Sequence, residues 1–336
     1  MRRTKEYFIR ASGGYICVSI KTNSVKQAIQ RFTKKYQQIL KGSWFFDVYD
    51  HSSMIKIMAT FEFNPVHSFV NKLLERGIKA TIENDTGRNY TVVVPLSGGK
   101  DSQACYEMAL QQHGSRNVLA LFCDTNFEHK KTYEHVMRLT KHKPLVRLNA
   151  GKVEDVMYKH NRFPHGLSRF CTDELKIRPS KFFYKYFSLE RGGFDVWYGI
   201  RSDESKQREK RYAGKLSTEK YTPNEFMASK YTKELGTQGV RIVLPVLEWS
   251  AKDIFSFLNG RENPLYREGF DRVGCFPCMI SGDKYKRKAF THDDIGNEHY
   301  IRMKTVSDAL KEPIYSTKSH KQYNAEESSG CSFCEM

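Results

Sequence analysis

Two patterns in this sequence have residue types and spacing that indicate a functional site: a glycine-rich turn, which could bind an anion, and two pairs of cysteines, which could bind a metal or take part in redox chemistry. The turn covers residues 97–102, reads SGGKDS and directly follows the apolar stretch 91–95. Adjacent glycines let a backbone turn sharply and point its N–H groups at an anion, and a helix that begins there adds its positive N-terminal end. We therefore expect the turn to bind phosphate. It is not a Walker A loop, because Val94 and Asp101 stand where that motif needs Gly and Ser or Thr.

The paired cysteines have the spacing CxxC, at Cys275 and Cys278 and again at Cys331 and Cys334. No apolar stretch with a small-residue cleavage site follows the basic N-terminus, so we expect no signal peptide and place the chain in the cytoplasm. In that compartment cysteines are metal or redox candidates before they are disulfides. Two structural alternatives stay open: the first pair is a turn with two buried thiols, and the second lies in a frayed tail.

The composition limits the class of protein. At 336 residues the chain is about twice as long as a typical domain, and a hydrophobic content of 39% excludes a mainly disordered chain. The apolar runs are six residues or shorter, so we expect no membrane-spanning segment. The formal net charge of +17 suits a partner that is itself an anion, and nucleic acids and phosphorylated substrates are the first candidates.

The first 88 residues are expected to form a domain of their own. The predicted strands are residues 14–20, 44–50, 54–63 and 79–83, and the predicted helices are residues 25–40 and 66–74. The order βαββαβ is the ferredoxin-like α+β pattern. This part is basic, with 15 Lys or Arg against 7 Asp or Glu over residues 1–90.

After residue 88 the pattern changes to short apolar strands that alternate with helical stretches. The predicted strands are residues 91–95, 118–123, 145–148, 195–200 and 241–246. Such alternation predicts a Rossmann-like α/β domain over residues 89–260, in which helices cover both faces of a parallel sheet and ligands bind at the carboxyl ends of the strands. Within it, the charged segment 206–233 is expected to be a loop over the site. Residues 261–336 are expected to form a C-terminal, cysteine-bearing region.

The SGGKDS turn resembles the PP-loop of the adenine nucleotide α-hydrolase-like superfamily. Four further segments narrow the resemblance to the phosphoadenosine phosphosulfate (PAPS) reductase family. They are DTNFEHKKTYE at residues 124–134, GIRSDESKQR at 199–208, LPVLEWSAKDI at 244–254 and NPLYREGFDRVGCFPC at 263–278. One departure is Asn126, which stands where the motif of the family has Gly.

The resemblance implies an adenine nucleotide site around the PP-loop, with arginines that clamp phosphate or sulfate. The implied catalytic residues are Lys100, Asp101 and Cys171. The implied nucleotide-binding residues are Ser97, Gly98, Gly99, Lys100, Asp101, Ser102, Asp124, Thr125, Gly199, Arg201, Glu204 and Arg208. The implied ligand is ATP with Mg²⁺, the metal being shared between the phosphates and Asp101. PAPS or adenylyl sulfate is the alternative ligand.

The resemblance also implies a metal site, because Cys171, Cys275 and Cys278 stand where the family places ligands. The second CxxC pair, Cys331 and Cys334, offers a fourth thiolate. Four thiolates suit a [4Fe–4S] cluster, and tetrahedral Zn²⁺ is the alternative.

The segment around Cys171 indicates which branch of the family the chain resembles. Residues 169–179 read RFCTDELKIRP, with one cysteine where cluster-bearing sulfonucleotide reductases have two adjacent ones. This form resembles DndC, the ATP-using sulfur-transfer protein of DNA phosphorothioation, and phage-type members of the family. The sequence also lacks the Glu-Cys-Gly-Ile-His tail that supplies the nucleophile in cluster-free PAPS reductases. The implied function is ATP-dependent, adenylating sulfur transfer to a nucleic acid.

Two other functions stay open. One is a sulfonucleotide reductase that releases sulfite from PAPS or adenylyl sulfate, and the other is a non-catalytic module that binds nucleotide or nucleic acid. The implied partners are an adenine nucleotide, a nucleic acid (DNA or tRNA), and a sulfur donor protein or a thioredoxin-like reductant. A homodimer is left open, and no membrane contact is expected.

Overall fold

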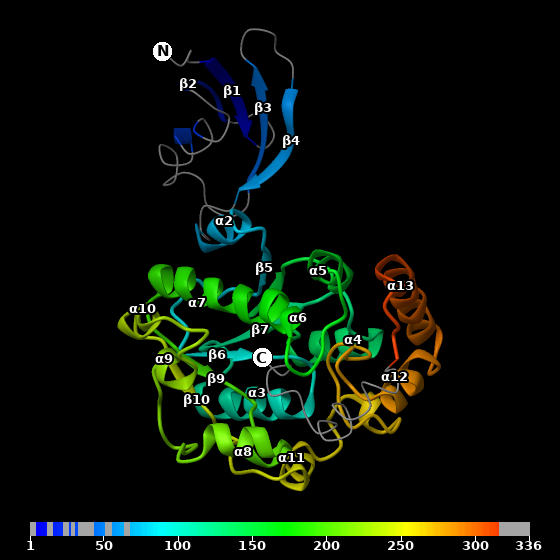
Figure 1. The fold of residues 1–336 in the computed structure, drawn as a ribbon. Helices are drawn as coiled ribbons and strands as arrows, with labels where there is room; N and C mark the ends of the chain where they lie inside the picture. The colour runs from blue at the N-terminus through cyan, green and yellow to red at the C-terminus, as the bar shows by residue number, and fades with distance from the viewer. Residues whose placement is uncertain are drawn as a thin grey trace. The chain divides into compact units, whose positions relative to one another are not determined.

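The computed structural model describes residues 5–11, 16–22, 27, 31–32, 44–50, 56–63 and 68–315 (Figure 1). The chain divides into two compact units, Met1–Glu75 and Arg76–Met336. Cys331 and Cys334 lie outside the described residues, so their role as metal ligands stays a prediction. Most of the helix predicted at residues 25–40 also lies outside them, although residues 27, 31 and 32 are helical.

The first unit contains a four-stranded antiparallel sheet with the order β2-β1-β3-β4. Its elements are β1 (Lys5–Ala11), β2 (Ile16–Thr22), β3 (Trp44–Asp50), β4 (Lys56–Phe63) and α2 (Ser68–Leu74). All but β1 begin and end within two residues of a predicted element. The sequence pattern does not predict β1, because Lys, Glu and Arg dilute its apolar residues. Since β1 pairs with β2 along its whole length, the unit opens with two paired strands.

The strand predicted at residues 79–83 is present but belongs to the other unit. β5 (Lys79–Glu83) pairs antiparallel with β8 (Leu145–Asn149), which is part of the larger sheet. The predicted ferredoxin-like order is therefore wrong, and the border between the units follows Glu75 rather than residue 88. A short strand pattern predicts that a strand forms, whereas its partner is decided by which sheet edge lies within reach.

The second unit is built on a six-stranded sheet with the order β10-β9-β6-β7-β8-β5. Its other strands are β6 (Val92–Pro95), β7 (Val118–Asp124), β9 (Asp195–Trp197) and β10 (Arg241–Val243). These four strands run parallel with β8, and β5 runs antiparallel. All five strands predicted after residue 88 are present, which confirms the Rossmann-like α/β fold. β6 and most of β7 are buried, as expected of strands that helices cover on both faces.

The order of the connections creates a switch point between β6 and β9. From β6 the chain continues through β7 to β8 on one side, and it then returns past β6 to β9 and β10 on the other. In open α/β sheets the ligand crevice lies at this place, outside the carboxyl ends of the strands. Residues 97–102 follow β6 and residues 199–201 follow β9, so two of the predicted site segments meet at the switch point.

Helices cover both faces of the large sheet (Figure 1). α7 lies on one side, and α3 and α11 lie on the other, where they share an apolar core with β6 and β7. The helices are α3 (Lys100–His113), α4 (Lys130–Leu139), α5 (Val153–His160), α6 (Phe170–Thr172), α7 (Arg178–Arg191), α8 (Lys206–Tyr212), α9 (Pro223–Phe226), α10 (Lys233–Thr237), α11 (Ala251–Leu258), α12 (Asp283–Phe290) and α13 (Asp294–Leu310). Shorter helical segments are η2 (Asp173–Ile177), η3 (Ser202–Glu204) and η4 (Pro264–Tyr266).

The segment predicted to be a loop, residues 206–233, is folded instead. It carries α8 and α9 and buries Phe226 and Tyr231 in the interior. The hydroxyl of Tyr231 lies 2.9 Å from that of Tyr198, which directly follows β9. The prediction fails because the many charged residues obscure the few apolar ones that anchor the segment.

The region after residue 260 belongs to the same compact unit as the large sheet. It buries a small apolar cluster of its own, which includes Leu265, Phe270 and Phe276. The backbone N–H of Phe276 donates to the carbonyl of Phe127 at 2.7 Å, just beyond the end of β7. The predicted C-terminal region is thus bonded to the edge of the sheet where the site residues gather. Within the described part of the chain, we find no helix that combines the length and the apolar character needed to cross a membrane.

Candidate nucleotide and thiol site

The PP-loop turns sharply between β6 and α3. Gly98 has a φ of 81°, in the left-handed region that favours glycine, and Gly99 is the N-cap of α3. Serine side chains hold the turn together, because Oγ of Ser97 and Oγ of Ser102 lie 3.1 Å apart and Ser102 donates to the carbonyl of Gly99 at 2.9 Å. The loop therefore presents the N-terminal end of a 14-residue helix, the part of a helix that attracts anions.

Two glycines of the motif segments are required by close packing. A Cβ atom on Gly98 would lie 2.6 Å from Cγ2 of Thr132. A Cβ atom on Gly199 would lie 2.6 Å from backbone atoms of Asp101 and Ser102. The bare backbone of Gly199 therefore lets the chain that leaves β9 touch the first turn of α3.

Lys100, Asp101 and Arg201 form a buried chain of charges at the switch point. Nζ of Lys100 lies 2.7 Å from Oδ2 of Asp101, and Oδ1 of Asp101 lies 2.6 Å from Nε of Arg201. Arg201 also pairs with Asp203, whose side chain is 46% exposed. The structure thus brings two predicted cations together around one carboxylate that is fully buried. Two cations beside a helix N-terminus suit the binding of a phosphate or sulfate.

A second turn, at residues 124–128, follows β7. Glu128 is buried and accepts hydrogen bonds from the N–H of Thr125 at 3.2 Å, the hydroxyl of Thr125 at 2.7 Å and the hydroxyl of Tyr133 at 3.0 Å. Asp124 accepts hydrogen bonds from the N–H of Asn126 and from the hydroxyl of Tyr133. Both carboxylates therefore shape the turn, and the predicted nucleotide contact of Asp124 stays a prediction.

Asn126 has a φ of 56°, which accounts for its departure from the motif glycine. Asn enters the left-handed region more readily than most side chains, because its short amide bonds locally. Here Nδ2 of Asn126 donates to the carbonyl of Gly151 at 3.2 Å. The turn thus keeps the backbone shape that the glycine would give.

The segment 263–278 lies against the PP-loop, and we call it the covering segment. Nδ2 of the buried Asn263 donates to the carbonyl of Gly98 at 3.2 Å. The hydroxyl of Tyr266 accepts the backbone N–H of Lys100 at 3.0 Å. The covering segment is therefore bonded to both sides of the glycine pair.

The same segment continues to the turn after β7. The carbonyl of Val273 would lie 3.3 Å from a Cβ on Gly99, so the segment still borders the loop there. Two residues later, Sγ of Cys275 lies 3.5 Å from Oγ1 of Thr125 and 4.0 Å from Oε1 of Glu128. One short stretch of chain therefore contacts both the PP-loop and the turn after β7.

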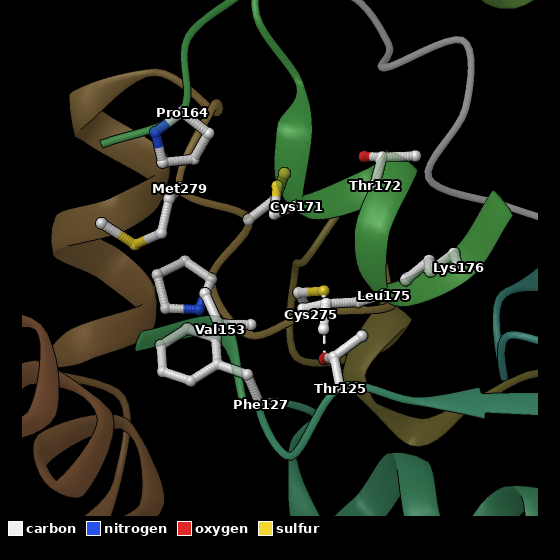
Figure 2. A pocket seen from close by; sticks show the side chains of 12 residues that line it. Thr125, Phe127, Val153, Pro164, Cys171, Thr172, Leu175, Lys176, Cys275 and Met279 are labelled. Atoms are coloured by element: carbon white, nitrogen blue, oxygen red, sulfur yellow. Dashed lines mark hydrogen bonds between the residues drawn. The ribbon is translucent and has the colours of Figure 1, made fainter. Parts of the chain in front are cut away.

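Cys171, Cys275 and Cys278 line one pocket together with the buried Lys176 (Figure 2). The figure shows Cys171 at the start of the helical run that carries Lys176, and Cys275 beside Thr125. The remaining lining residues are mostly apolar: Thr125, Phe127, Val153, Pro164, Thr172, Leu175, Pro277 and Met279. The structure thus brings together the three predicted cysteines that it describes in this region.

Burial controls the protonation of this pocket. It raises the pKa of the Cys171 thiol to about 12, and the neighbouring Cys278 and Cys275 add to the shift. Burial also raises the pKa of the Cys275 thiol. Burial by itself lowers the pKa of Lys176, but the neighbouring acidic groups, with Cys275 and Glu128 the largest of them, together raise it above its usual value. The thiols of Cys171 and Cys275 are therefore harder to deprotonate than a free cysteine.

The described residues do not complete either predicted metal site. Among them, no three or more His, Cys, Asp or Glu side chains form a group able to hold a metal ion. The pocket supplies three thiols where a cluster or structural zinc takes four ligands. Asp101 does not suit the predicted Mg²⁺ either, because both of its carboxylate oxygens are bonded to cations.

Glu204 and Arg208, two predicted nucleotide-binding residues, pair with each other. The side chain of Arg208 is fully buried, and the backbone N–H of Arg208 donates to Oγ of Ser205, the N-cap of α8, at 3.2 Å. The pair therefore anchors the start of α8, and its contact with nucleotide stays a prediction.

Three residues of this site are absent from the sequence-based candidates: Glu128, Lys176 and Tyr266. Each lies inside a segment that carries the family resemblance, so a closer look at the polar residues of those segments could have identified them. Residue type alone gives no such signal, because an exposed Glu, Lys or Tyr reads the same in a sequence as a buried one.

The doubly wound sheet, with a glycine-rich loop at its switch point, defines the class: an α/β protein of the PP-loop kind. Residues 91–280 match the family model described as the phosphoadenosine phosphosulfate reductase domain. This match covers more than half of the sequence, and the chain belongs to that family.

Individual relatives are distant. The chain is 27% identical over 241 residues to an uncharacterized protein of Escherichia phage 186, covering 56% of this chain and 66% of that protein. It is 28% identical over 206 residues to an uncharacterized protein of Methanocaldococcus jannaschii, covering 59% of this chain and 38% of that protein. The chain thus spans less than two thirds of the length of these relatives. Adenosine 5'-phosphosulfate reductase 1 of Bacillus subtilis is 25% identical over 201 residues, 57% of this chain and 72% of that enzyme.

One solved structure similar to the chain is the PAPS reductase of Candida auris in its phosphate complex. The superposition covers 56% of this chain and 81% of that one, with 16% identity and a TM-score of 0.35.

Proposed function

We propose that this chain binds ATP at the PP-loop, adenylates an oxygen of a nucleic acid and directs sulfur to the activated position. In the first step the acceptor oxygen attacks the α-phosphorus of ATP, and pyrophosphate leaves. In the second step hydrosulfide attacks the atom that bears the adenylated oxygen, and AMP leaves. ATP is consumed to AMP and pyrophosphate, and one oxygen of the acceptor is replaced by sulfur.

The observation that carries this proposal is the course of the covering segment, residues 263–278. It bonds to the phosphate loop through Asn263 and Tyr266, and it places Cys275 beside Thr125 in the thiol pocket. A nucleotide on the loop and sulfur chemistry in the pocket are thereby linked through one stretch of backbone. This arrangement supports a reaction that couples a nucleotide to sulfur.

The charged residues at the switch point have distinct roles in this reaction. Lys100 and the N-terminal amides of α3 stabilise negative charge on the phosphates as pyrophosphate departs. Arg201 supplies a second cation and presents a planar guanidinium that suits phosphate oxygens. Asp101 holds both cations in position, because its two oxygens bond to Lys100 and Arg201.

A nucleic-acid acceptor is supported by the excess of positive charge. The net charge of the chain is +17, and residues 1–90 hold about twice as many basic as acidic residues. The basic run KYKRK at residues 284–288 adds little further support, because two of its cations are engaged inside the chain. Lys286 is buried and donates to the carbonyl of Ile314 at 2.7 Å, and the guanidinium of Arg287 packs over the ring of Tyr315 at 3.9 Å.

A second candidate is a sulfonucleotide reductase. The observation that favours it is the similarity to adenosine 5'-phosphosulfate reductases of two Bacillus species, at 25% and 24% identity. In that reaction the same loop holds the nucleotide, and a cysteine thiolate attacks the sulfur of the sulfonucleotide. The third candidate, a binding module without turnover, keeps the loop but carries out neither step.

One experiment separates the three candidates. The full chain is assayed for exchange of labelled pyrophosphate into ATP in the presence of DNA or tRNA, and for sulfite release from PAPS and adenylyl sulfate with a dithiol reductant. Lys100→Ala is the test variant. Lys252→Ala, an exposed lysine on α11, is the matched control.

We expect pyrophosphate exchange that requires a nucleic acid. Lys100→Ala should abolish this exchange, and Lys252→Ala should leave it unchanged. Sulfite release without exchange identifies the reductase instead. Nucleotide binding with neither activity identifies the binding module. An absence of exchange with every nucleic acid tried overturns the proposed function.

A further inference from the structure

The hydroxyl of Tyr266 covers the end of the PP-loop. Gly99, the N-cap of α3, has no side chain to bond the first N–H groups of the helix. The N–H of Lys100 finds its acceptor 166 residues away, in the hydroxyl of Tyr266 at 3.0 Å. An acceptor in front of the first N–H groups of a helix stands where an oxygen of a bound phosphate or sulfate stands.

The covering segment holds this hydroxyl in place. Asn263 caps η4, the turn that carries Tyr266, by accepting the N–H of Leu265, and it bonds to the carbonyl of Gly98. The ring of Tyr266 also meets that of Phe255 edge to face, with centroids 5.6 Å apart. Both rings lie within 6 Å of the ammonium group of Lys100. The aromatic pair thus lies over the lysine that is proposed to contact the phosphates.

A neighbouring amide of the loop is covered in a similar way. The N–H of Gly99 points at Oγ of Ser97 at 3.4 Å, a long and weak hydrogen bond. The bond to Tyr266 is shorter and comes from outside the loop. Of these two hydroxyl groups, that of Tyr266 can therefore leave without unfolding the turn.

From this geometry we propose that Tyr266 is a gate at the phosphate subsite. Its hydroxyl accepts the N–H of Lys100, and an arriving phosphate displaces it and takes over that N–H. Binding is then a competition between an internal hydroxyl and the ligand oxygen. This inference rests on the proposed binding of phosphate by the loop, and it adds the residue that sets the affinity for it.

The test measures binding of inorganic pyrophosphate and of ATP to the full chain by calorimetry. Tyr266→Phe keeps the ring packing and removes the competing hydroxyl, so it leaves the N–H of Lys100 without its partner until an anion binds. We expect the dissociation constant to fall about two- to tenfold, the range of one net hydrogen bond. Tyr285→Phe is the matched control, because it lies in the same apolar cluster and its hydroxyl donates to the carbonyl of Arg272 at 2.6 Å.

The outcomes separate the gate from the proposed function. The gate is supported if pyrophosphate and ATP bind more tightly to Tyr266→Phe than to the wild type or to Tyr285→Phe. It is also supported if only Tyr266→Phe binds them detectably. Unchanged or weaker binding to Tyr266→Phe overturns the gate and leaves phosphate binding by the loop intact, provided that Lys100→Ala abolishes it. If neither the wild type nor Tyr266→Phe binds either probe, both the gate and the proposed function fail.

Amide hydrogen exchange gives a second readout on the same samples. The gate predicts faster exchange of the Lys100 amide in Tyr266→Phe than in wild type. It also predicts that pyrophosphate restores protection in both proteins. Equal exchange rates in the two ligand-free proteins contradict the gate.

Discussion

Oδ1 of Asp101 lies 2.6 Å from Nε of Arg201, although 100 residues separate the two in the sequence. Asp101 lies in the first turn of α3, the helix that follows β6, and Arg201 follows β9, the strand beside β6 in the sheet. Their contact therefore ties the two sides of the switch point together through a buried ion pair. It depends on the close approach of backbone that Gly199 allows.

Replacing the buried carboxylate is expected to destabilise the fold. Asp101→Asn leaves Lys100 and Arg201 close together without their shared counter-charge, and the free energy of unfolding is expected to fall by about 3 kcal/mol. Urea denaturation of the full chain measures this change. Asp203→Asn is the control, since Asp203 also pairs with Arg201 but is half exposed, and its loss is expected to change stability by less than about 1 kcal/mol. Equal losses of unfolding free energy in the two variants would show that burial of the Asp101–Arg201 ion pair does not increase its contribution to stability.

The contact between β9 and α3 has a steric test. Gly199→Ala places a methyl group 2.6 Å from backbone atoms of the first turn of α3, so the loop must shift. We expect a loss of about 1–3 kcal/mol in stability, together with weaker nucleotide binding. Gly282→Ala, where a Cβ meets nothing within 4 Å, is expected to change stability by less than about 1 kcal/mol. A fully stable Gly199→Ala protein with normal binding contradicts the described packing.

Asn126 is expected to tolerate glycine but not a β-branched residue. Its φ of 56° is open to glycine, so Asn126→Gly loses at most the amide bond to Gly151, about 1 kcal/mol. Asn126→Val adds the strain of a β-branched side chain in the left-handed region, and the total loss is expected to reach about 2–4 kcal/mol. Thermal unfolding of the two variants ranks them. The reverse ranking would exclude the left-handed conformation.

The stability of the second unit is expected to fall in mild acid because of His135. This side chain is buried, with Nε2 2.9 Å from Oε1 of Gln103 and Nδ1 2.7 Å from the guanidinium of Arg138. Burial, with Arg138 adding to it, lowers the pKa of His135 from 6.5 to about 4. Between these values the unfolded chain takes up a proton that the folded chain does not, so stability decreases as the pH falls from 6.5 toward 4. The loss from pH 7 to pH 5 is about 2 kcal/mol.

The measurement for His135 is urea denaturation at pH 7 and at pH 5. His135→Gln cannot take up the proton, so its stability is expected to change by about 2 kcal/mol less than that of the wild type over this range. His142→Asn, at an exposed position with a φ of 58°, should keep the full wild-type dependence. If His135→Gln keeps it as well, another group is responsible.

Local patterns in the sequence predict most of the second unit. Five parallel strands and the glycine turn are each encoded within ten residues or fewer, by apolar runs and by backbone freedom, and the structure confirms them. The partner of a strand is not encoded locally. β5 pairs with β8 at the edge of the large sheet, and nothing in the sequence of β5 itself selects that edge over an edge of the smaller sheet.

The same limit applies to the site. Lys100, Asp101 and Arg201 follow strand ends, where ligands bind in such sheets, so their meeting could be predicted. The roles of Glu128 and Tyr266 could not, because each depends on a tertiary contact: Glu128 bonds its own turn beside Cys275, and Tyr266 bonds an amide from a distant part of the chain. The segment 206–233 shows the opposite error, in which abundant surface charge conceals buried anchors such as Tyr231.

The distance in sequence between Lys100 and Tyr266 also sets an order of events during translation. At about 5–20 residues per second, the 166 residues between them take roughly 8–33 s to synthesise. Throughout that interval the nascent chain holds the glycine loop while the residue that covers it does not yet exist. The contact between Lys100 and Tyr266 therefore forms only after the covering segment has been synthesised, so it is one of the last contacts that the PP-loop acquires.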